Sequence, residues 1–156
     1  MKKKVFILGV SGQDGSLLAE YLVKKNILVY GLLRKSSNRN YANLANVRNK
    51  KNFKVVNGDI LDIFSIERNI KEIKPDEIYN LAAQSHVAVS FKTPVFSTQT
   101  GTLGSLSILE PLRNFDKDVK FYQASSSEMY GGSSKEKLNE NSLFDPKSPY
   151  AASKAF

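Results

Sequence analysis

Tyr150 and Lys154, near the end of the chain, are four positions apart, so a helix would bring both side chains to one face. A tyrosine can act as an acid-base catalyst near neutral pH when a nearby positive charge stabilises its phenolate. The lysine ammonium would supply that charge. A lone Tyr and Lys at this spacing more often form an exposed helix pair, so the pair gains meaning only from the residues that accompany it.

A second polar group lies in the stretch 124–131, which reads Ala-Ser-Ser-Ser-Glu-Met-Tyr-Gly and follows an apolar segment. A hydroxyl such as that of Ser126 can hold a substrate hydroxyl during its oxidation. Glu128 offers the second acid-base group that separates an elimination from simple hydride transfer. Singly, a serine run usually means a loop and such a glutamate is usually solvated. Together these residues predict a catalytic set of Ser126, Glu128, Tyr150 and Lys154.

Near the amino terminus, Gly9, Gly12 and Gly15 recur in a Gly-x-x-Gly-x-x-Gly pattern between an apolar strand and a helix. One glycine allows a tight turn, one lets a pyrophosphate approach the backbone, and one permits close packing of helix on strand. The phosphate would lie against the first helical amides. Glycines can also merely punctuate such a turn, but their place after the first strand favours dinucleotide binding.

The end of the second predicted strand reads Leu-Arg-Lys-Ser-Ser, from 33 to 37, and contains no acid. A cofactor with an unphosphorylated ribose usually meets Asp or Glu there. The cationic and hydroxyl donors of Arg34, Lys35 and Ser36 suit a ribose 2′-phosphate instead, which favours NADP over NAD. The alternative is a solvated basic loop. Asp59 and Ile60 follow the third strand, where the carboxylate could accept from an adenine amino group.

The strands and helices that must position these residues alternate along the chain. After the fourth strand, Ala82 and Ala83 have side chains small enough for a cofactor to pass close to the backbone. Alternation of strands and helices predicts parallel βαβ units, hence an α/β fold with a doubly wound parallel sheet. We expect apolar faces of Leu17, Leu18, Tyr21 and Leu22 on the first helix, and of Leu103, Leu106, Ile108, Leu109 and Leu112 on a later one. The expected strands are 4–8, 28–33, 53–56, 77–81 and 119–123, and the expected helices are 14–25, 63–73, one from Pro94 and one from Pro149 capped by Ser148.

Composition narrows the class of protein. The chain has 156 residues, of which 41% are hydrophobic, enough for one domain with a core. Without cysteine and with one histidine, no metal site is expected. No run nears the roughly 20 apolar residues of a membrane span, and the basic start reads as a strand rather than a signal peptide, so we expect a cytoplasmic protein.

The net charge is +8, and the excess of positive charge is concentrated in 34–54, where seven basic residues and no acidic one occur. Only two aromatic residues occur there, and a single-strand nucleic-acid binder needs aromatic side chains on which bases stack, so we expect no nucleic-acid partner.

Several stretches together resemble the GDP-mannose 4,6-dehydratase family, one of the extended short-chain dehydrogenases. The resemblance runs along nearly the whole chain, and its most specific parts are the Gln-Asp within the glycine turn and the Ala-Ala-Gln-Ser-His segment. The stretches are Gly-Val-Ser-Gly-Gln-Asp-Gly-Ser at 9–16, Arg-Lys-Ser-Ser-Asn at 34–38, Pro-Asp-Glu-Ile-Tyr-Asn-Leu-Ala-Ala-Gln-Ser-His-Val at 75–87, Phe-Tyr-Gln-Ala-Ser at 121–125 and Ser-Pro-Tyr-Ala at 148–151.

The resemblance implies an NADP-binding Rossmann-like domain and a lyase activity. GDP-mannose would be oxidised at carbon four, lose water across carbons five and six, and regain hydride at carbon six, giving GDP-4-dehydro-6-deoxy-mannose, a precursor of GDP-fucose. Ser126 would bind and polarise the sugar, and Glu128 would serve the elimination. Tyr150 would be the base, with Lys154 holding its ionisation and the nicotinamide ribose.

Cofactor contacts implied by the resemblance form a longer set. They are Gly9, Gly12, Gln13, Asp14, Gly15, Arg34, Lys35, Ser36, Asp59, Ile60, Leu81, Ala82, Ala83, Gln84, Ser85 and Lys154. Two positions depart from the wider family. Gly101 stands where Asn or Asp is usual, and Phe96 where a cofactor-contacting Tyr is common.

The family resemblance also bears on assembly and length. The basic segment resembles a loop that reaches a neighbouring subunit's cofactor, so a homotetramer is expected. Family members are roughly twice as long, so residues 1–156 would be the NADP-binding domain without its C-terminal substrate domain, which a separate fragment could supply. The alternatives are a non-catalytic NADP-binding or oligomerisation module, or a dehydratase or epimerase for another nucleotide sugar; Glu128 argues against a simple epimerase.

Overall fold

The computed structural model describes residues 2–34, 41–131 and 137–156. It divides into two compact units. Unit 1 is Met1–Ala82 with Ser105–Ala124, and unit 2 is Ala83–Gly104 with Ser125–Phe156. Each unit has its own architecture, and the expectation of one domain over 1–156 stays a prediction. Within the described ranges, no helix combines the length and the apolar character needed to cross a bilayer.

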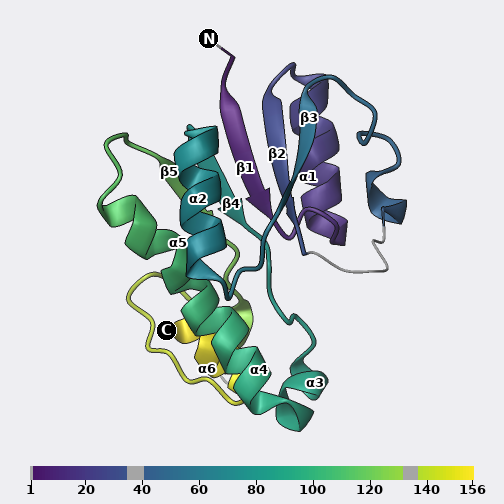
Figure 1. Ribbon diagram of the computed structural model, residues 1–156. Coiled ribbons are helices and arrows are strands. Elements are labelled where there is room, and N and C mark those ends of the chain that lie inside the picture. Colours follow the sequence, from purple (N-terminus) through teal and green to yellow (C-terminus); the bar gives the residue numbers. More distant parts are fainter. Residues whose placement is uncertain (1, 35–40, 132–136) are drawn as a thin grey trace. The chain divides into compact units, whose positions relative to one another are not determined.

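Unit 1 is built on a five-stranded parallel sheet with strand order β3-β2-β1-β4-β5 (Figure 1). The chain lays down three strands in one direction and then returns to the other side of β1, so the order reverses between β1 and β4. This confirms the doubly wound fold, and the predicted strand limits differ by at most one residue. The strands are β1 (Lys4–Leu8), β2 (Leu28–Leu33), β3 (Phe53–Asn57), β4 (Glu77–Asn80) and β5 (Lys120–Gln123).

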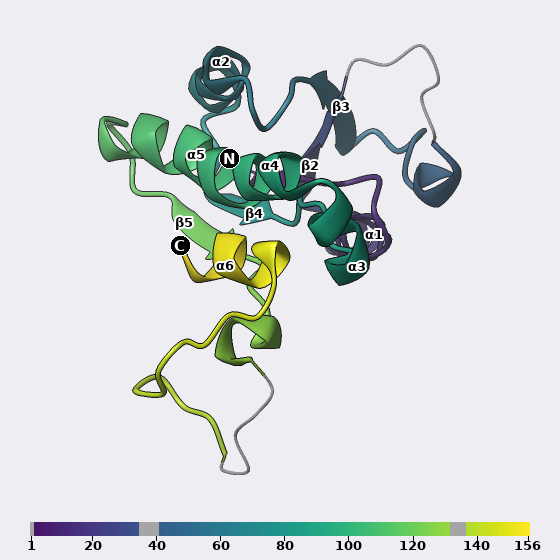
Figure 2. The same cartoon turned by 90° about the horizontal axis from the view of Figure 1, so that it is seen from below.

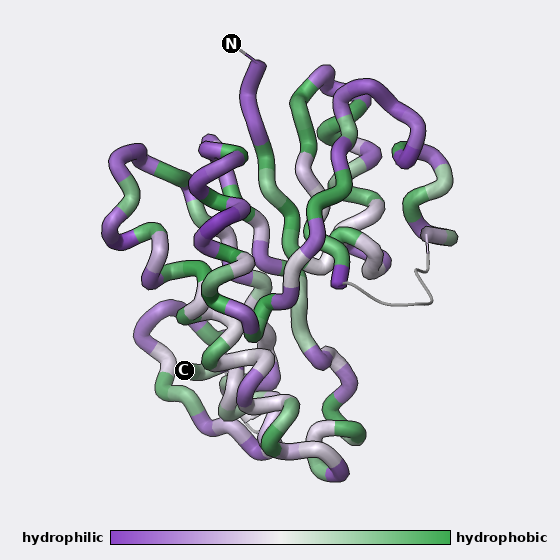
Figure 3. The backbone as a smooth tube through the Cα atoms, viewed as in Figure 1, coloured by the Kyte–Doolittle hydropathy of each residue, from purple (hydrophilic) through white to green (hydrophobic). Residues whose placement is uncertain are grey.

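The alternation of side chains along β1 feeds two separate cores. Val5 and Ile7 pack with residues of α1 (Gln13–Lys24), whereas Phe6 and Leu8 pack with α2 (Ile63–Ile73) and with Ile108 of α5 (Gly104–Arg113). All four β1 side chains are fully buried. Figure 2 shows α1 and α2 on opposite sides of the sheet, and in Figure 3 β1 turns from hydrophilic to hydrophobic as it enters this layer. Burial on both faces explains why the strand reads as a continuous apolar run.

The predicted apolar face of α1 is partly wrong. Leu17 and Tyr21 are each 59% exposed, while the core side of the helix carries Gly15, Ala19 and Leu22. The buried positions follow helical spacing, but small residues occupy most of them. A helix that packs closely on a parallel sheet needs small side chains at the contact, so the largest apolar residues did not mark the buried face.

The helix expected from Pro94 begins there, as α4 (Pro94–Thr98). A single π turn, η2 (Gln99–Leu103), then connects it to α5 (Gly104–Arg113). A π turn contains more residues than an α turn, so it rotates the following helix relative to a regular α-helical phase.

The apolar face expected on this helix is largely wrong. Leu103, Leu106 and Leu109 are 40–52% exposed, whereas Ile108 is fully buried and Ser107 is 5% exposed. Within α5, Ile108 and Leu112 are four positions apart and pack on the core, while Leu106 and Leu109 share another face, and spacing alone does not say which face is buried.

Unit 2 collects the short helices around one C-terminal helix, α6 (Pro149–Ala155). The helix α6 packs against α4, against the π turn η2, against α3 (Val87–Lys92) and against the 3-10 turn η3 (Ser127–Tyr130). This arrangement makes α6 the centre of the unit.

Asp76 joins the amino ends of three strands in unit 1. Its carboxylate accepts hydrogen bonds from the Lys4 amide and the Lys117 ammonium, both at 2.7 Å. Its own amide donates to the Lys4 carbonyl at 2.9 Å, and its carbonyl accepts from the Lys120 amide at 3.0 Å. The hydrogen bond from Lys117 and then that from the Lys4 amide hold the pKa of Asp76 below its ordinary value of 3.8.

We predict that Asp76→Asn lowers the free energy of unfolding at pH 7 by roughly 1 kcal/mol, a value reduced for the solvent exposure of the ion pair. Because the pKa of Asp76 is lowered on folding, its contribution is fully present above pH 3.8 and disappears as pH falls through the lower folded value. Urea unfolding of both proteins from pH 7 to pH 2.5 measures this. A difference that persists undiminished at the acid end would contradict it, and Asp116→Asn serves as an exposed control.

Candidate functional site

Two glycines of the turn after β1 are required by the chain's own packing. Gly9 has φ +80, and a Cβ added to it would come within 2.7 Å of the backbone of Leu81 and Ala82. A Cβ on Gly15 would come within 2.3 Å of the Gly9 carbonyl oxygen. Both contacts are with backbone, which cannot move aside cheaply. The turn after β1 thus touches the turn after β4, at the reversal of strand order where such sheets bind ligands.

Gly12 is different. Its φ of −71 suits any residue, and an added Cβ would meet only the Gly9 carbonyl oxygen, at 3.3 Å. Gly12 is also the N-cap of α1 and carries no side chain to bind the first helical amides, those of Gln13, Asp14 and Gly15. Internal packing therefore requires glycine at positions 9 and 15, whereas at position 12 it opposes a side chain only mildly. An exposed, uncapped helix start fits the close approach of an anionic group.

The segment after β2 is fixed to this turn by a residue that the sequence did not single out. The Asn43 side chain donates to the Ser11 carbonyl at 2.9 Å, and the Asn46 side chain donates to Glu20 of α1 at 2.9 Å. Arg34 is exposed at the end of β2, while the predicted contacts Lys35 and Ser36 lie outside the described residues. Asparagine is common in loops, so no sequence signal distinguished Asn43.

Asp59 and Ile60, after β3, have different surroundings. The Asp59 side chain is half-buried and accepts from the Leu61 amide at 3.0 Å. Ile60 is 6% exposed, its side chain belongs to the core beside α2, and its carbonyl accepts from the Ser107 hydroxyl. Any contact of Ile60 with a ligand would therefore use its main chain.

The end of β4 is organised by Asn80, another residue that sequence reasoning missed. Asn80 is 1% exposed; its amide nitrogen donates to Gln123 at 2.8 Å and its side-chain oxygen accepts from the Ala82 amide at 3.2 Å. A buried polar residue must be paired in this way. The pairing fixes Ala82, which lies half-buried next to Leu81. A single asparagine ending an apolar strand is a signal that could have revealed it.

The start of unit 2 contains the remaining predicted cofactor contacts. Ala83 and Ser85 are exposed. Gln84 instead makes bonds within the unit: it donates to the His86 carbonyl at 3.0 Å and accepts from the Ser97 hydroxyl at 3.2 Å.

The helix α6 begins as the sequence predicts. The Ser148 hydroxyl accepts from the Ala151 amide at 3.0 Å, and Pro149 occupies the first helical position. The Lys154 ammonium lies 5.9 Å from the centroid of the Tyr150 ring, which confirms that both side chains share one face. Burial lowers the pKa of Lys154 from its ordinary value.

Of the other two predicted catalytic residues, Glu128 lies on the turn η3, against which α6 packs, and Ser126 is the N-cap of that turn. The Ser126 hydroxyl oxygen accepts from the Glu128 amide at 3.2 Å, a bond that does not use the hydroxyl hydrogen. The Glu128 side chain is exposed. The structure thus brings the helix of Tyr150 and Lys154 next to the turn of Ser126 and Glu128, within one unit.

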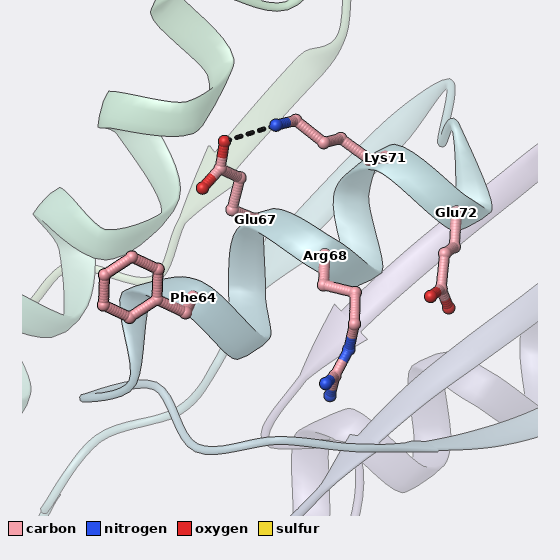
Figure 4. A pocket seen from close by; sticks show the side chains of 5 residues that line it. All are labelled: Phe64, Glu67, Arg68, Lys71 and Glu72. Atoms are coloured by element: carbon pink, nitrogen blue, oxygen red, sulfur yellow. Dashed lines mark hydrogen bonds and ion pairs between the residues drawn. The ribbon is translucent and has the colours of Figure 1, made fainter.

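The described residues offer no metal site, and the hollow on α2 is not part of the predicted site. The described part of the chain contains no cluster of three or more His, Asp or Glu side chains that could hold a metal ion. A hollow of about 330 Å³ lies on the outer face of α2 (Figure 4). None of the predicted site residues lines it; its side chains are Phe64, Glu67, Arg68, Lys71 and Glu72.

Comparison with known proteins agrees with this geometry. Residues 6–156 match the family model described as GDP-mannose 4,6 dehydratase. The chain belongs to this family. GDP-mannose 4,6-dehydratase of Vibrio cholerae is 42% identical over 100% of this chain, and GDP-mannose 4,6 dehydratase 2 of Arabidopsis thaliana is 47% identical over 98%. The alignments cover 44% and 43% of those two proteins, so the chain spans somewhat less than half the length of these curated relatives.

Among solved structures, the UDP-glucose 4-epimerase of Thermus thermophilus in complex with NAD superimposes with a TM-score of 0.82 at 30% identity. The match covers 97% of this chain and 47% of the epimerase. The chain thus belongs to a family of dehydratases. Over 97% of its length it has the same fold as the matching part of this epimerase.

We predict that the turn tolerates alanine at position 12 but not at position 15. Gly15→Ala should lower the free energy of unfolding by about 2–3 kcal/mol, because the new methyl group meets backbone. Gly12→Ala should lower it by less than about 1 kcal/mol, because only one atom crowds the new group. Urea unfolding of the two variants and the parent measures both. Equal losses would show that Gly12 is also needed for packing, contrary to the geometry.

Proposed function

We propose that this chain is the cofactor-binding and catalytic part of a GDP-mannose 4,6-dehydratase, a lyase that uses NADP and acts on GDP-mannose. The observation that carries the proposal is the packing of the helix with Tyr150 and Lys154 against the turn with Ser126 and Glu128. Family membership over residues 6–156 supports the same reaction.

In this proposal Tyr150 removes the proton from the hydroxyl on carbon four of the mannose. The positive charge of Lys154, 5.9 Å from the tyrosine ring centroid, stabilises the phenolate that this step requires. Ser126 donates its hydroxyl hydrogen to the same sugar oxygen, since its lone pair already accepts from the Glu128 amide. A bound oxidised nicotinamide supplies the hydride acceptor for carbon four and later the donor for carbon six.

Glu128 is proposed to serve the elimination. A ketone at carbon four makes the proton on carbon five acidic, so a carboxylate can remove it. The electrons of that C–H bond form the carbon-carbon double bond, while the C–O bond at carbon six breaks and the hydroxyl leaves as water after taking a proton. Glu128 is exposed in unit 2 and can exchange protons with solvent between these steps.

The cofactor proposed for the turn after β1 is NADP. Gly12, Gln13, Asp14 and Gly15 would hold the pyrophosphate at the start of α1. The related Thermus epimerase was solved with NAD, so the choice of NADP depends on the end of β2. Arg34 is exposed there and no acid adjoins it, which favours a 2′-phosphate; Lys35 and Ser36 belong to the same proposal.

The remaining contacts and partners are part of the proposal. Leu81, Ala82, Ala83, Gln84, Ser85 and the main chain of Ile60 would line the cofactor's path, with Asp59 at the adenine. A homotetramer, a cytoplasmic location and a separate or continuous C-terminal part that completes the substrate site are proposed with it. No resident metal and no nucleic-acid partner are proposed.

Calorimetric titration of the chain with NADP and with NAD, in moderate salt to suppress nonspecific attraction, tests the cofactor assignment. We expect NADP to bind more tightly, and Arg34→Ala to weaken NADP about tenfold while sparing NAD, because it removes one charge-assisted phosphate contact. Gly12→Ala should weaken both. Arg113→Ala, an exposed arginine of α5, is the control. If neither NADP nor NAD binds, the proposal is overturned.

Glu128→Gln tests the elimination, in protein complemented with the C-terminal half of a curated relative. We expect loss of the 6-deoxy product by about 10²–10⁴-fold, with oxidation at carbon four preserved, because glutamine cannot take the proton. Product analysis by NMR and nicotinamide absorbance separate the two steps. Glu140→Gln, an exposed glutamate of the same unit, should have no effect. Retained elimination would remove the role of Glu128, and no turnover from a folded parent complex would contradict the dehydratase assignment.

A further inference from the structure

Gly101, in the π turn η2, lies directly against Ser153 of α6. A Cβ added to Gly101 would be 2.3 Å from the Ser153 Oγ, 2.6 Å from its Cβ and 3.1 Å from its carbonyl oxygen. Contacts below 3.0 Å are not tolerated between carbon and its neighbours, so no side chain fits at position 101 with α6 in its present place. The π turn and α6 therefore approach each other through backbone on one side and a small side chain on the other.

Small buried side chains occur on α6, on the π turn and on α4, which also packs on α6. Ser97 is 2% exposed, Thr100 is 8% exposed, Ala151 is fully buried and Ser153 is 5% exposed. The hydroxyls of Thr100 and Ser153 donate to carbonyls of their own helices, those of Phe96 and Tyr150. Because these groups are satisfied locally, what the interface determines is the distance of approach of α6.

We propose that Gly101 and Ser153 are positioning residues that set how closely α6 packs against the π turn, and thereby fix the places of Tyr150 and Lys154. Ser153 is the immediate neighbour of Lys154 and lies three residues after Tyr150 in one short helix. A push on Ser153 moves all three, since a hydrogen-bonded helix shifts as a body. The inference relies on the proposed function only in naming Tyr150 and Lys154 as catalytic.

Glycine at this position needs such a reason, because glycine in a helix interior is unfavourable compared with alanine. No side chain fits beside Ser153 as it stands. The pair is thus a matched one: the absence of a side chain at 101 makes room for the hydroxymethyl group at 153.

The first measurement is thermal unfolding of Gly101→Ala, Ser153→Gly and the double variant. Alanine at a roomy helical position would raise Tm, so a fall of about 5–10 °C in Gly101→Ala is diagnostic of the contact. Adding Ser153→Gly removes the two nearest atoms, and the double variant should be more stable than the sum of the single effects predicts. Thr98→Ala, at an exposed position of α4, is the matched control. An unchanged or raised Tm in Gly101→Ala overturns the proposal.

The second measurement distinguishes positioning from stability alone. An NMR titration of the lysine side chains, with Lys154 assigned through Lys154→Arg, reports the burial of that ammonium in the folded protein. Below the Tm of each variant, Gly101→Ala should move the Lys154 pKa toward its ordinary value of 10.5, and Ser153→Gly should reverse the shift. A Tm that falls with an unchanged Lys154 pKa overturns the positioning role. The Tm and the Lys154 pKa are both measured without cofactor or turnover. If the proposed function is wrong, parallel titrations with NADP show no binding, while these two measurements still test the positioning role.

Discussion

The close passage of Gly9 past Leu81 and Ala82 is the constraint on which the arrangement of unit 1 depends. Backbone meets backbone there, at distances that a Cβ would violate. The contact brings the turn after β1 next to the turn after β4, where the strand order reverses, and Asn80 holds the second turn through its bond to the Ala82 amide. Because both turns are fixed by the sheet, Gly12 can leave the start of α1 open without weakening the core.

Close approach of backbones also shapes unit 2, which is built from short helices. Four short elements pack on α6, and small residues at the contacts let the backbones come close. The outcome is that the helix with Tyr150 and Lys154 lies next to the turn that carries Glu128 and is capped by Ser126. Burial of the Lys154 ammonium costs stability and lowers its pKa. Such a cost is typical of residues retained for chemistry rather than for folding.

Much of this was predictable from local patterns. Apolar runs marked the five strands, Ser148 and Pro149 marked the start of α6, and a four-residue spacing placed Tyr150 and Lys154 on one face. The wrong predictions concern which face of a helix is buried, because the distance at which elements pack decides this. Leu17 and Tyr21 satisfy helical periodicity yet remain exposed, because the sheet accepts Gly15 and Ala19 more closely. The π turn gave no sequence signal, and on α5 the core takes Ile108 while Leu106 stays exposed.

The sequence by itself determined the order of strands and helices, the glycine turn, the residues proposed as catalytic and, through its resemblance, the family. Those features depend on residues near one another in the chain, where spacing and side-chain chemistry act directly. Only the tertiary structure decided that Gly12 is crowded far less than Gly9 and Gly15, that Asn43 and Asn80 hold the two turns, and that Gly101 faces Ser153. Each of these depends on a contact between distant segments, and its distance follows from the packing of whole elements.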